Sequence, residues 1–309
     1  MSDVLALSEW LAPLQAILLR HGYRRLHIGG SSAREILDHL RFGVDLALRD
    51  LDVYLLKHAT VRAADLHALC DDVRELGLAT IGPVREKRRA TPSGADRVVG
   101  AGVHLFSRGR PILSLGVLHH PTDLALNGLF DVDTILLAVD NDQPFRLGPV
   151  LDPHGGYRAW RERRPRIVHW AEVERCFARN AFRIVRTLAK ASLLHVPPEL
   201  ADGYRRRRPA TPHIDDPLEL HRVFLKVLGD PHWAEEPVML ADLRALTLVS
   251  AALQAEIDAT TADALRQAIP TPAGATAAEL ARLRARTLCG GSTILDALLA
   301  ATPLVYGMP

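Results

Sequence analysis

Residues 27 to 56 read "HIGGSSAREILDHLRFGVDLALRDLDVYLL", and this stretch decides the fold. A short apolar strand ends in two glycines, and helical spacing begins near Ser31. The run "LRDLDVYLL" is short, apolar and contains β-branched and aromatic residues, so it predicts a strand. Asp50 and Asp52 are two residues apart on it, and alternate side chains of a strand point to the same face. The stretch therefore predicts two carboxylates that point into one space.

Two like charges on one face need an explanation. A hard divalent cation between them relieves the repulsion, and Mg²⁺ prefers oxygen ligands. Gly29 and Gly30 allow a close approach to the backbone, and the N-terminus of the following helix, capped by Ser31 or Ser32, offers N–H groups to a phosphate. This combination is typical of phosphoryl or nucleotidyl transfer. The simpler interpretation is a pair of surface aspartates at a turn.

The order of the remaining patterns predicts the architecture. Helix and strand patterns alternate up to about residue 150, with a loop expected over "GPVREKRRATPSGADR" and strands over "VVGAGVHLFSRG" and "PILSLGVLHH". After "VLDPHGGYRAW" only helical patterns follow. We expect an α+β head with a mixed sheet over 1–150, a helical neck over 151–230 and a helical body over 231–309.

Charge and cysteine content narrow the class of protein. The formal net charge of the 309 residues is +2, but residues 151–210 hold 14 Lys and Arg against 6 Asp and Glu, an excess of 8, so the rest of the chain sums to −6. A local basic surface of this kind favours a polyanionic partner. Three scattered cysteines predict a reducing, cytoplasmic location, and the absence of a long apolar run argues against a membrane partner.

Four motifs in order resemble a known family. They are "GGSSAREIL" followed by "RDLDVYL", then "PTDLALNGLF", then "LDPHGGYRAW", and finally "RNAFRIVR". The set is similar to that of the polymerase-β-type nucleotidyltransferases, and within them to the bacterial CCA-adding enzymes and poly(A) polymerases. The resemblance covers about residues 25 to 195, and it implies a polymerase-β-like head, a Mg²⁺ cofactor, ATP or CTP as the substrate and an RNA 3′ end as the acceptor.

The resemblance also implies roles for individual residues. Asp50 and Asp52 correspond to the catalytic metal ligands. The nucleotide-binding positions are Gly29, Gly30, Ser31, Arg34, Asp123, Asn127, Arg183 and Arg186. The basic residues expected to contact RNA phosphates are Arg161, Arg163, Arg164, Arg205, Arg206, Arg207 and Arg208. For Arg34 a largely structural role is the alternative, for Asp123 and Asn127 helix capping, and for the arginines a solvated surface.

Two departures from the family pattern bear on activity. The family's third carboxylate aligns with Ser114, and its Glu-Asp pair on the neck helix has become Arg179 and Asn180. Asp131 or Asp133 is a candidate replacement for the third carboxylate, although we expect both on the solvent face of an edge strand. The sequence thus leaves three hypotheses: transfer to RNA, transfer to a protein or small molecule, and a binding module without catalysis.

Overall fold

The computed structural model divides the chain into two compact units, Met1–His169 and Trp170–Pro309. The predicted division of the helical part into neck and body stays a prediction. The residues that the structure describes are 12, 14–46, 51–56, 63–75, 80–90, 96–107, 110–118, 128–141, 146–210, 217–290 and 295–306.

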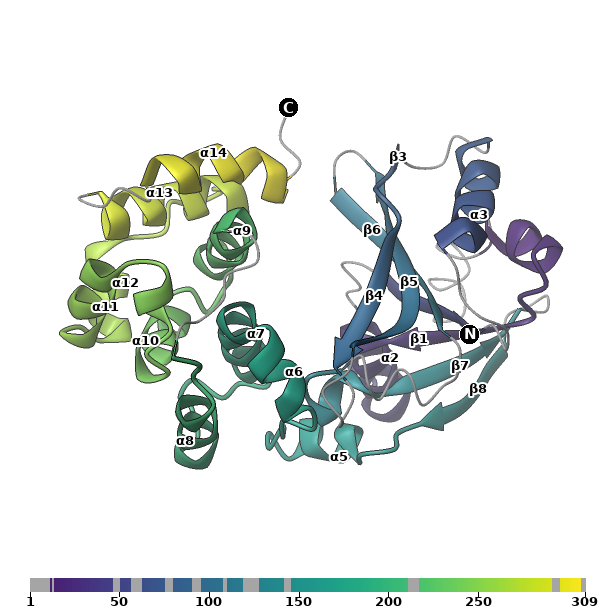
Figure 1. Ribbon diagram of the computed structural model, residues 1–309, viewed down its shortest axis with the longest axis horizontal. Helices are drawn as coiled ribbons and strands as arrows, with labels where there is room; N and C mark the ends of the chain where they lie inside the picture. Colours follow the sequence, from purple (N-terminus) through teal and green to yellow (C-terminus); the bar gives the residue numbers. More distant parts are fainter. Residues whose placement is uncertain are drawn as a thin grey trace. The chain divides into compact units, whose positions relative to one another are not determined.

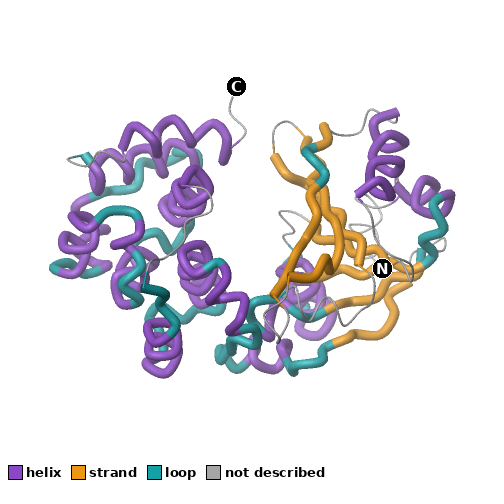
Figure 2. Tube along the Cα trace, viewed as in Figure 1, coloured by secondary structure: helices purple, strands orange, loops and turns teal. Residues whose placement is uncertain are grey.

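The first unit is built on one mixed sheet, drawn in orange in Figure 2. Its strands are β1 (Arg25–Gly29), β2 (Leu51–Leu56), β3 (Thr80–Ile81), β4 (Arg85–Ala90), β5 (Asp96–Ser107), β6 (Arg110–Leu118), β7 (Leu136–Asp140) and β8 (Arg146–Leu151). The order across the sheet is β3-β5-β6-β2-β1-β7-β8, and β4 pairs with β5. The β2–β6 pair is parallel and the other pairs are antiparallel.

Alternation along the strands separates the two faces of this sheet. In β2 the odd-numbered residues Leu51, Val53 and Leu55 are fully buried, whereas the residues between them are half-buried. The buried face packs against α2 (Gly30–Phe42) and α3 (Ala63–Glu75) in one hydrophobic core (Figure 1). Burial of these apolar side chains is the main stabilising contribution to the unit. The opposite face carries Asp52 and Tyr54, and we call it the second face.

One predicted loop is a strand. The segment "REKRRA" at residues 85–90 was expected to be irregular, yet it forms β4 and pairs antiparallel with β5. Its charged residues have low intrinsic strand preference and no apolar alternation. The long partner strand β5 supplies the hydrogen bonds, so a contact distant in sequence overrides the local pattern.

The second unit is entirely helical in its described residues (Figure 1). Its elements are α6 (Trp170–Arg175), α7 (Phe177–Lys190), α8 (Pro198–Arg206), α9 (Pro217–Leu228), α10 (Glu235–Asp242), η2 (Leu246–Leu248), α11 (Ala251–Asp258), α12 (Ala262–Ala268), α13 (Ala277–Cys289) and α14 (Leu295–Tyr306). Phe177 of α7 stacks on Tyr204 of α8 at 4.2 Å between ring centroids, and Phe182 meets Phe224 of α9 edge-on at 6.1 Å. These aromatic contacts join three helices in one core.

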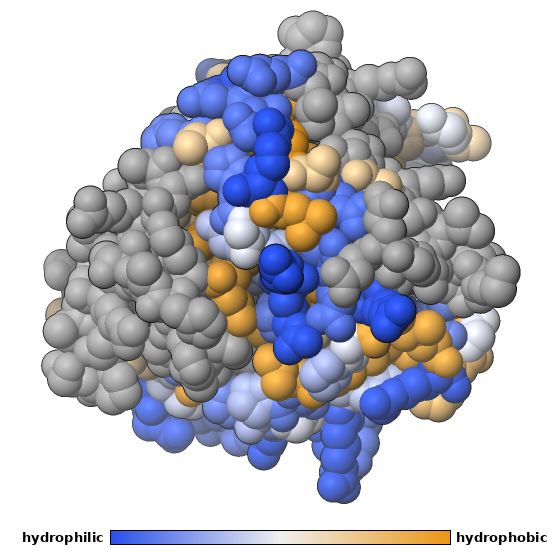
Figure 3. All heavy atoms as spheres, turned by 90° about the vertical axis from the view of Figure 1, so that its right-hand side faces the viewer, coloured by the Kyte–Doolittle hydropathy of each residue, from blue (hydrophilic) through white to orange (hydrophobic). Residues whose placement is uncertain are grey.

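The surface of the described residues is mixed in polarity. In Figure 3 the hydrophobic residues lie in small groups among hydrophilic ones. None of the helices in the described ranges is long and apolar enough to cross a membrane.

Candidate active site

The turn between β1 and α2 brings the Asp52 carboxylate to a helix end. Gly29 pairs with Asp52 across β1 and β2, and Gly30 begins α2 with a φ of 61°. A side-chain carbon at Gly30 would lie 2.6 Å from Asp52 Oδ2. Only glycine both adopts this left-handed conformation without strain and leaves room for the carboxylate. The Gly-Gly pair therefore allows the chain to turn from β1 into α2 directly beside the Asp52 carboxylate.

The N-terminus of α2 has no side-chain cap. The N-cap residue is Gly29, so the expectation that Ser31 or Ser32 caps the helix is wrong. Both serines lie inside the first turn, and the Ser32 hydroxyl instead accepts a 3.4 Å hydrogen bond from the Asp52 backbone N–H. The first-turn N–H groups of a helix have no partners within the helix, so this end suits a phosphate. Asp52 and the helix end together form the candidate site.

Several predicted site residues lie outside the described ranges. These are Asp50, Asp123 and Asn127. The expected convergence of Asp50 with Asp52, and the ribose contacts that the resemblance implies, stay predictions.

A row of polar residues crosses the second face beside Asp52. Asp52 of β2 pairs with Ser114 of β6, and Ser114 pairs with His104 of β5. The Ser114 hydroxyl and His104 Nδ1 are 2.8 Å apart and hydrogen-bonded. Ser114 is the residue that the sequence motifs align with the family's third carboxylate, and that alignment stays a prediction. Sequence reasoning missed His104, because only the register between β5 and β6 brings it into this row.

The donor set fits a metal ion in part. Asp52 offers a half-buried carboxylate oxygen beside a helix end that suits phosphate, and Ser114 offers a neutral oxygen. Within the described residues no group of three or more His, Cys, Asp or Glu side chains is placed to hold a metal. The role of Asp50 as the second metal ligand stays a prediction, because Asp50 lies outside the described ranges.

Asp131 is a buried structural residue and does not replace the third carboxylate. It was expected on the solvent face of an edge strand, but it lies fully buried in the 3₁₀ helix η1 (Asp131–Asp133). Its Oδ1 accepts hydrogen bonds from the backbone N–H groups of Val132 and Arg166, and its Oδ2 accepts from Arg166 Nε at 3.1 Å. Burial raises the pKa of Asp131, although these donors oppose the shift. Both oxygens are occupied by protein donors.

Arg34 connects α2 to the same 3₁₀ helix. Its side chain is 4% exposed, donates to the Val132 carbonyl at 2.5 Å and lies 3.4 Å from Asp133 Oδ1. The guanidinium also stacks 4.7 Å from the Trp160 ring of α5 (Gly156–Arg161). These contacts match the structural alternative for Arg34.

The "DPHGG" turn has a structural role in the first unit. The Asp152 carboxylate accepts the backbone N–H groups of Gly156 and Tyr157 at 2.6 and 3.0 Å and thereby caps α5. Gly156 is packed against the Asp131 backbone carbonyl so closely that no side chain fits between them. The turn positions α5 against η1.

In the second unit, the predicted nucleotide-facing arginines of α7 differ in their surroundings. Arg186 lies 3.8 Å from Asp230, whereas half-buried Arg183 has no ion pair or side-chain hydrogen bond among the described residues. Asn180 is fully buried and donates to the Glu172 backbone carbonyl at 2.6 Å. Arg183 is the member of this set whose guanidinium is available to a ligand.

The predicted RNA-binding run at 205–208 is mostly engaged with the protein itself. Arg205 pairs with Asp202 at 2.7 Å, Arg207 pairs with Glu174 at 3.2 Å, and Arg208 donates to the Arg244 carbonyl and the Thr247 hydroxyl, each at 3.1 Å. Arg206 is exposed and has no such partner in the described part of the chain.

The other predicted cluster, at 161–164, lies in the first unit. Arg161 pairs with Asp38 at 3.3 Å and stacks 4.0 Å from the Phe42 ring. Arg163 and Arg164 are exposed, without ion pairs to described residues. Among the predicted RNA-contacting arginines, Arg163, Arg164 and Arg206 are thus the exposed ones without ion pairs to described residues.

Comparison with known proteins identifies similar structures only at low sequence identity. No protein-family model matches the sequence, and no curated protein matches it. One similar structure is a tRNA-processing enzyme, at 14% identity and a TM-score of 0.53, covering 83% of this chain and 63% of that one. A second is a tRNA nucleotidyltransferase complexed with a primer tRNA and an incoming ATP analog, at 15% identity and a TM-score of 0.53, covering 83% and 68%.

A third similar structure is a Thermotoga maritima CCA-adding enzyme complexed with tRNA, at 12% identity and a TM-score of 0.50, covering 95% of this chain and 62% of that one. The chain thus spans about two thirds of the length of these proteins. The likeness confirms the predicted fold class, a polymerase-β-like head with a mixed sheet followed by helices.

Proposed function

We propose that this protein is a Mg²⁺-dependent nucleotidyltransferase that moves a nucleoside monophosphate from ATP or CTP to a hydroxyl at the 3′ end of an RNA. The observation that carries the proposal is the contact between the Asp52 carboxylate and Gly30 at the uncapped N-terminus of α2. A phosphate bound at this helix end lies beside a carboxylate of the same charge. A divalent cation held by Asp52 would offset this repulsion.

Each side chain has a defined task in this proposal. Asp52, together with Asp50, would hold the ion, and the bound ion would supply charge neutralisation and activation of the acceptor hydroxyl. The backbone N–H groups of Gly30 and Ser31 orient the triphosphate. Arg183, in the second unit, is the residue to which the resemblance assigns a nucleoside contact. The acceptor oxygen then forms a bond to the α-phosphorus, the bond from that phosphorus to the bridging oxygen breaks, and pyrophosphate leaves.

The fold supports an RNA acceptor. Similar structures include enzymes solved with a primer tRNA and with an ATP analog. The excess of basic residues over 151–210 agrees with a polyanionic acceptor.

Incubation of the protein with each labelled nucleoside triphosphate and total RNA, with and without Mg²⁺, tests the proposal. Label in RNA that depends on Mg²⁺ is the expected result. Label in a protein or small molecule would move the acceptor to that class.

A binding module without catalysis is the second candidate function. The observation that favours it is the Ser114 hydroxyl in the row beside Asp52, where the family pattern has a carboxylate. Nucleotide binding without any labelled product in the same incubation would establish this second function.

The salt dependence of RNA binding is predicted from the exposed arginines without ion pairs to described residues, which are Arg163, Arg164 and Arg206. Each phosphate contact on a single strand contributes roughly −0.7 to the log–log slope of affinity against salt. Replacing Arg206, or Arg163, by alanine is expected to flatten the slope by about that amount and to weaken binding alike on a tRNA and on an unrelated RNA. Arg208→Ala is the matched control, because its guanidinium already binds Arg244 and Thr247. Identical slopes for Arg206→Ala and wild type would show that Arg206 is only solvated.

A further inference from the structure

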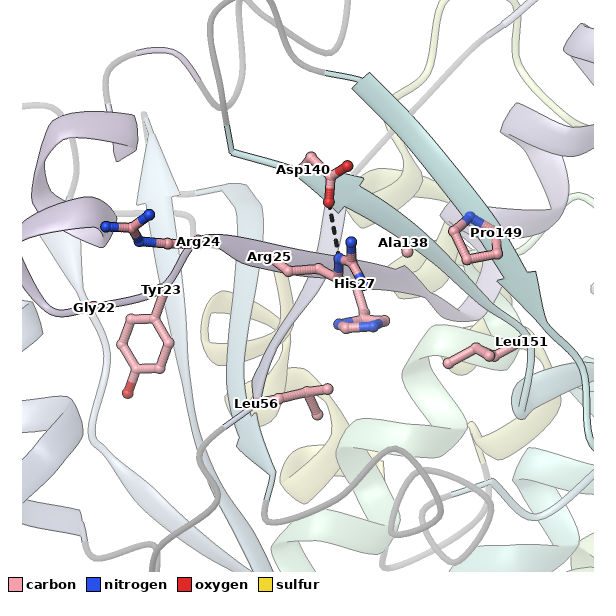
Figure 4. Close-up of a pocket in the computed structure, with 10 residues that line it drawn as sticks. All are labelled: Gly22, Tyr23, Arg24, Arg25, His27, Leu56, Ala138, Asp140, Pro149 and Leu151. Atoms are coloured by element: carbon pink, nitrogen blue, oxygen red, sulfur yellow. Dashed lines mark hydrogen bonds and ion pairs between the residues drawn. The ribbon is translucent and has the colours of Figure 1, made fainter.

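A pocket of about 710 Å³ lies in the first unit, and its described lining includes neither Asp52 nor Gly30. Its described lining comes from four strands and the segment before β1: Gly22, Tyr23, Arg24, Arg25, His27, Leu56, Ala138, Asp140, Pro149 and Leu151 (Figure 4). The volume is within the range of small-molecule sites, which are typically mostly apolar with a few placed polar groups. Nothing in the proposed transfer reaction uses this pocket.

His27 is the polar group at the centre of the pocket. Figure 4 shows its ring between Leu56 and Leu151, below the pair formed by Arg25 and Asp140. The residue is only 3% exposed, and its Nδ1 has no hydrogen-bond partner among the described residues. A buried nitrogen without a partner is costly for a protein, and such an atom calls for an explanation. A bound ligand that hydrogen-bonds to Nδ1 supplies one.

The chemistry around His27 selects the kind of ligand. Burial and the nearby Arg25 lower the pKa of His27 to about 4, so the ring is neutral at neutral pH and offers one donor and one acceptor. At the rim Arg25 Nε donates to Asp140 Oδ1 at 2.8 Å, which leaves further guanidinium donors and a second carboxylate oxygen at the same edge. The Asp140 carboxylate would repel a free anion here. A purely apolar ligand would leave His27 and the remaining donors and acceptors of Arg25 and Asp140 without hydrogen-bond partners. A flat ring with donors and acceptors along its edge satisfies both the polar edge and the apolar walls.

We propose that this pocket binds a nucleobase, with His27 and the Arg25–Asp140 pair hydrogen-bonding to its edge and Leu56, Pro149 and Leu151 contacting its faces. The inference rests on the proposed function in one respect, the origin of the base. His27 and Gly29 are neighbours on the second face of β1, about 7 Å apart at the rise of a strand, and Gly29 pairs with Asp52. The pocket therefore adjoins the proposed transfer site, and the base belongs either to a free nucleotide or to an acceptor strand.

The imidazole signals of His27 in NMR spectra give a readout located in the pocket. We would use the wild-type protein, which has no triphosphate to turn over in these samples, and assign the signals by their loss in a His27→Phe variant. Adding adenosine monophosphate or a short single-stranded RNA is expected to shift them. A shift with the RNA alone assigns the base to an acceptor strand, and a shift with the mononucleotide alone assigns it to a free nucleotide. Saturating amounts of both that leave the His27 signals unchanged would overturn the proposal.

The second test of the proposal measures the affinity of the ligand for variants of the pocket. His27→Phe keeps a planar ring and removes the nitrogens, so the dissociation constant of the ligand that shifts His27 should rise about tenfold. Leu56→Trp fills the pocket from its edge and keeps His27, so it covers the case in which His27→Phe does not fold. His67→Phe, an exposed histidine of α3, is the matched control and should change nothing.

The two proposals fail separately. A shift of the His27 signals in wild-type protein that shows no transfer activity would reject only the proposed reaction. Full transfer activity combined with unchanged affinity and unchanged acceptor KM in both pocket variants would reject only the nucleobase site.

Discussion

Asp52→Asn is expected to abolish nucleotidyl transfer, with a loss of kcat of about a thousandfold or more, while the protein stays folded. The substitution removes one negative charge at nearly constant shape. A metal ion contributes several kcal/mol of charge stabilisation in the transition state, and each 1.4 kcal/mol corresponds to a factor of ten in rate. The carboxylate also lies against the N-terminus of α2, but its loss there costs only about 0.3–1 kcal/mol of stability.

The measurement is incorporation of labelled nucleotide into RNA at saturating Mg²⁺, with circular dichroism to verify folding. Asp45→Asn is the matched control, because it makes the same chemical change at an exposed carboxylate of the same unit. Equal turnover by the Asp52→Asn variant and wild type would show that Asp52 is not part of the catalytic site. The proposed function would then lose the observation that carries it.

Glu236→Gln is expected to stabilise the second unit at alkaline pH. Glu236 is fully buried in α10, and its carboxyl group lies beside that of Asp230. Burial, reinforced by Asp230, raises the pKa of Glu236 from 4.5 to about 9, while Arg186 and Lys190 oppose the shift. Because the pKa in the folded state is the higher one, the stabilising contribution is complete below about pH 4.5 and is lost as the pH rises towards 9.

The wild-type free energy of unfolding should therefore fall between pH 5 and 9, by up to about 1.4 kcal/mol per pH unit from this group. The glutamine variant lacks this dependence and should be more stable by a few kcal/mol at pH 8. Urea unfolding of both proteins across this range measures the effect, with Glu199→Gln, an exposed glutamate of α8, as control. A glutamine variant whose free energy of unfolding falls with pH as steeply as that of wild type would show that Glu236 does not cause the dependence.

Arg186 links this buried acid to the predicted nucleotide site. It lies 3.8 Å from Asp230, which also faces Glu236. A protonated Glu236 leaves Asp230 as the charged partner of Arg186. Arg186 is thus paired on this helix, whereas Arg183 has no ion pair to any residue that the structure describes.

The local patterns of the sequence determined the elements that build the candidate site. Alternation in "LDVYLL" places Asp52 on the face opposite the core, and the glycine pair before a helical pattern predicts a turn that only glycine permits. The change from alternating strand and helix patterns to helices alone likewise predicted a head followed by a helical part. These features depend on neighbours a few residues apart, and their period is visible in a single chain.

Tertiary structure alone decided which residues meet. The charged segment "REKRRA" is a strand because β5 pairs with it, and Asp131 is buried because Arg166 and the "DPHGG" turn close over it. The register of β5 on β6 places His104 against Ser114, and that of β1 between β2 and β7 builds the pocket around His27. Pairing partners and burial are set by contacts between residues far apart in sequence, whose free energies no local pattern encodes.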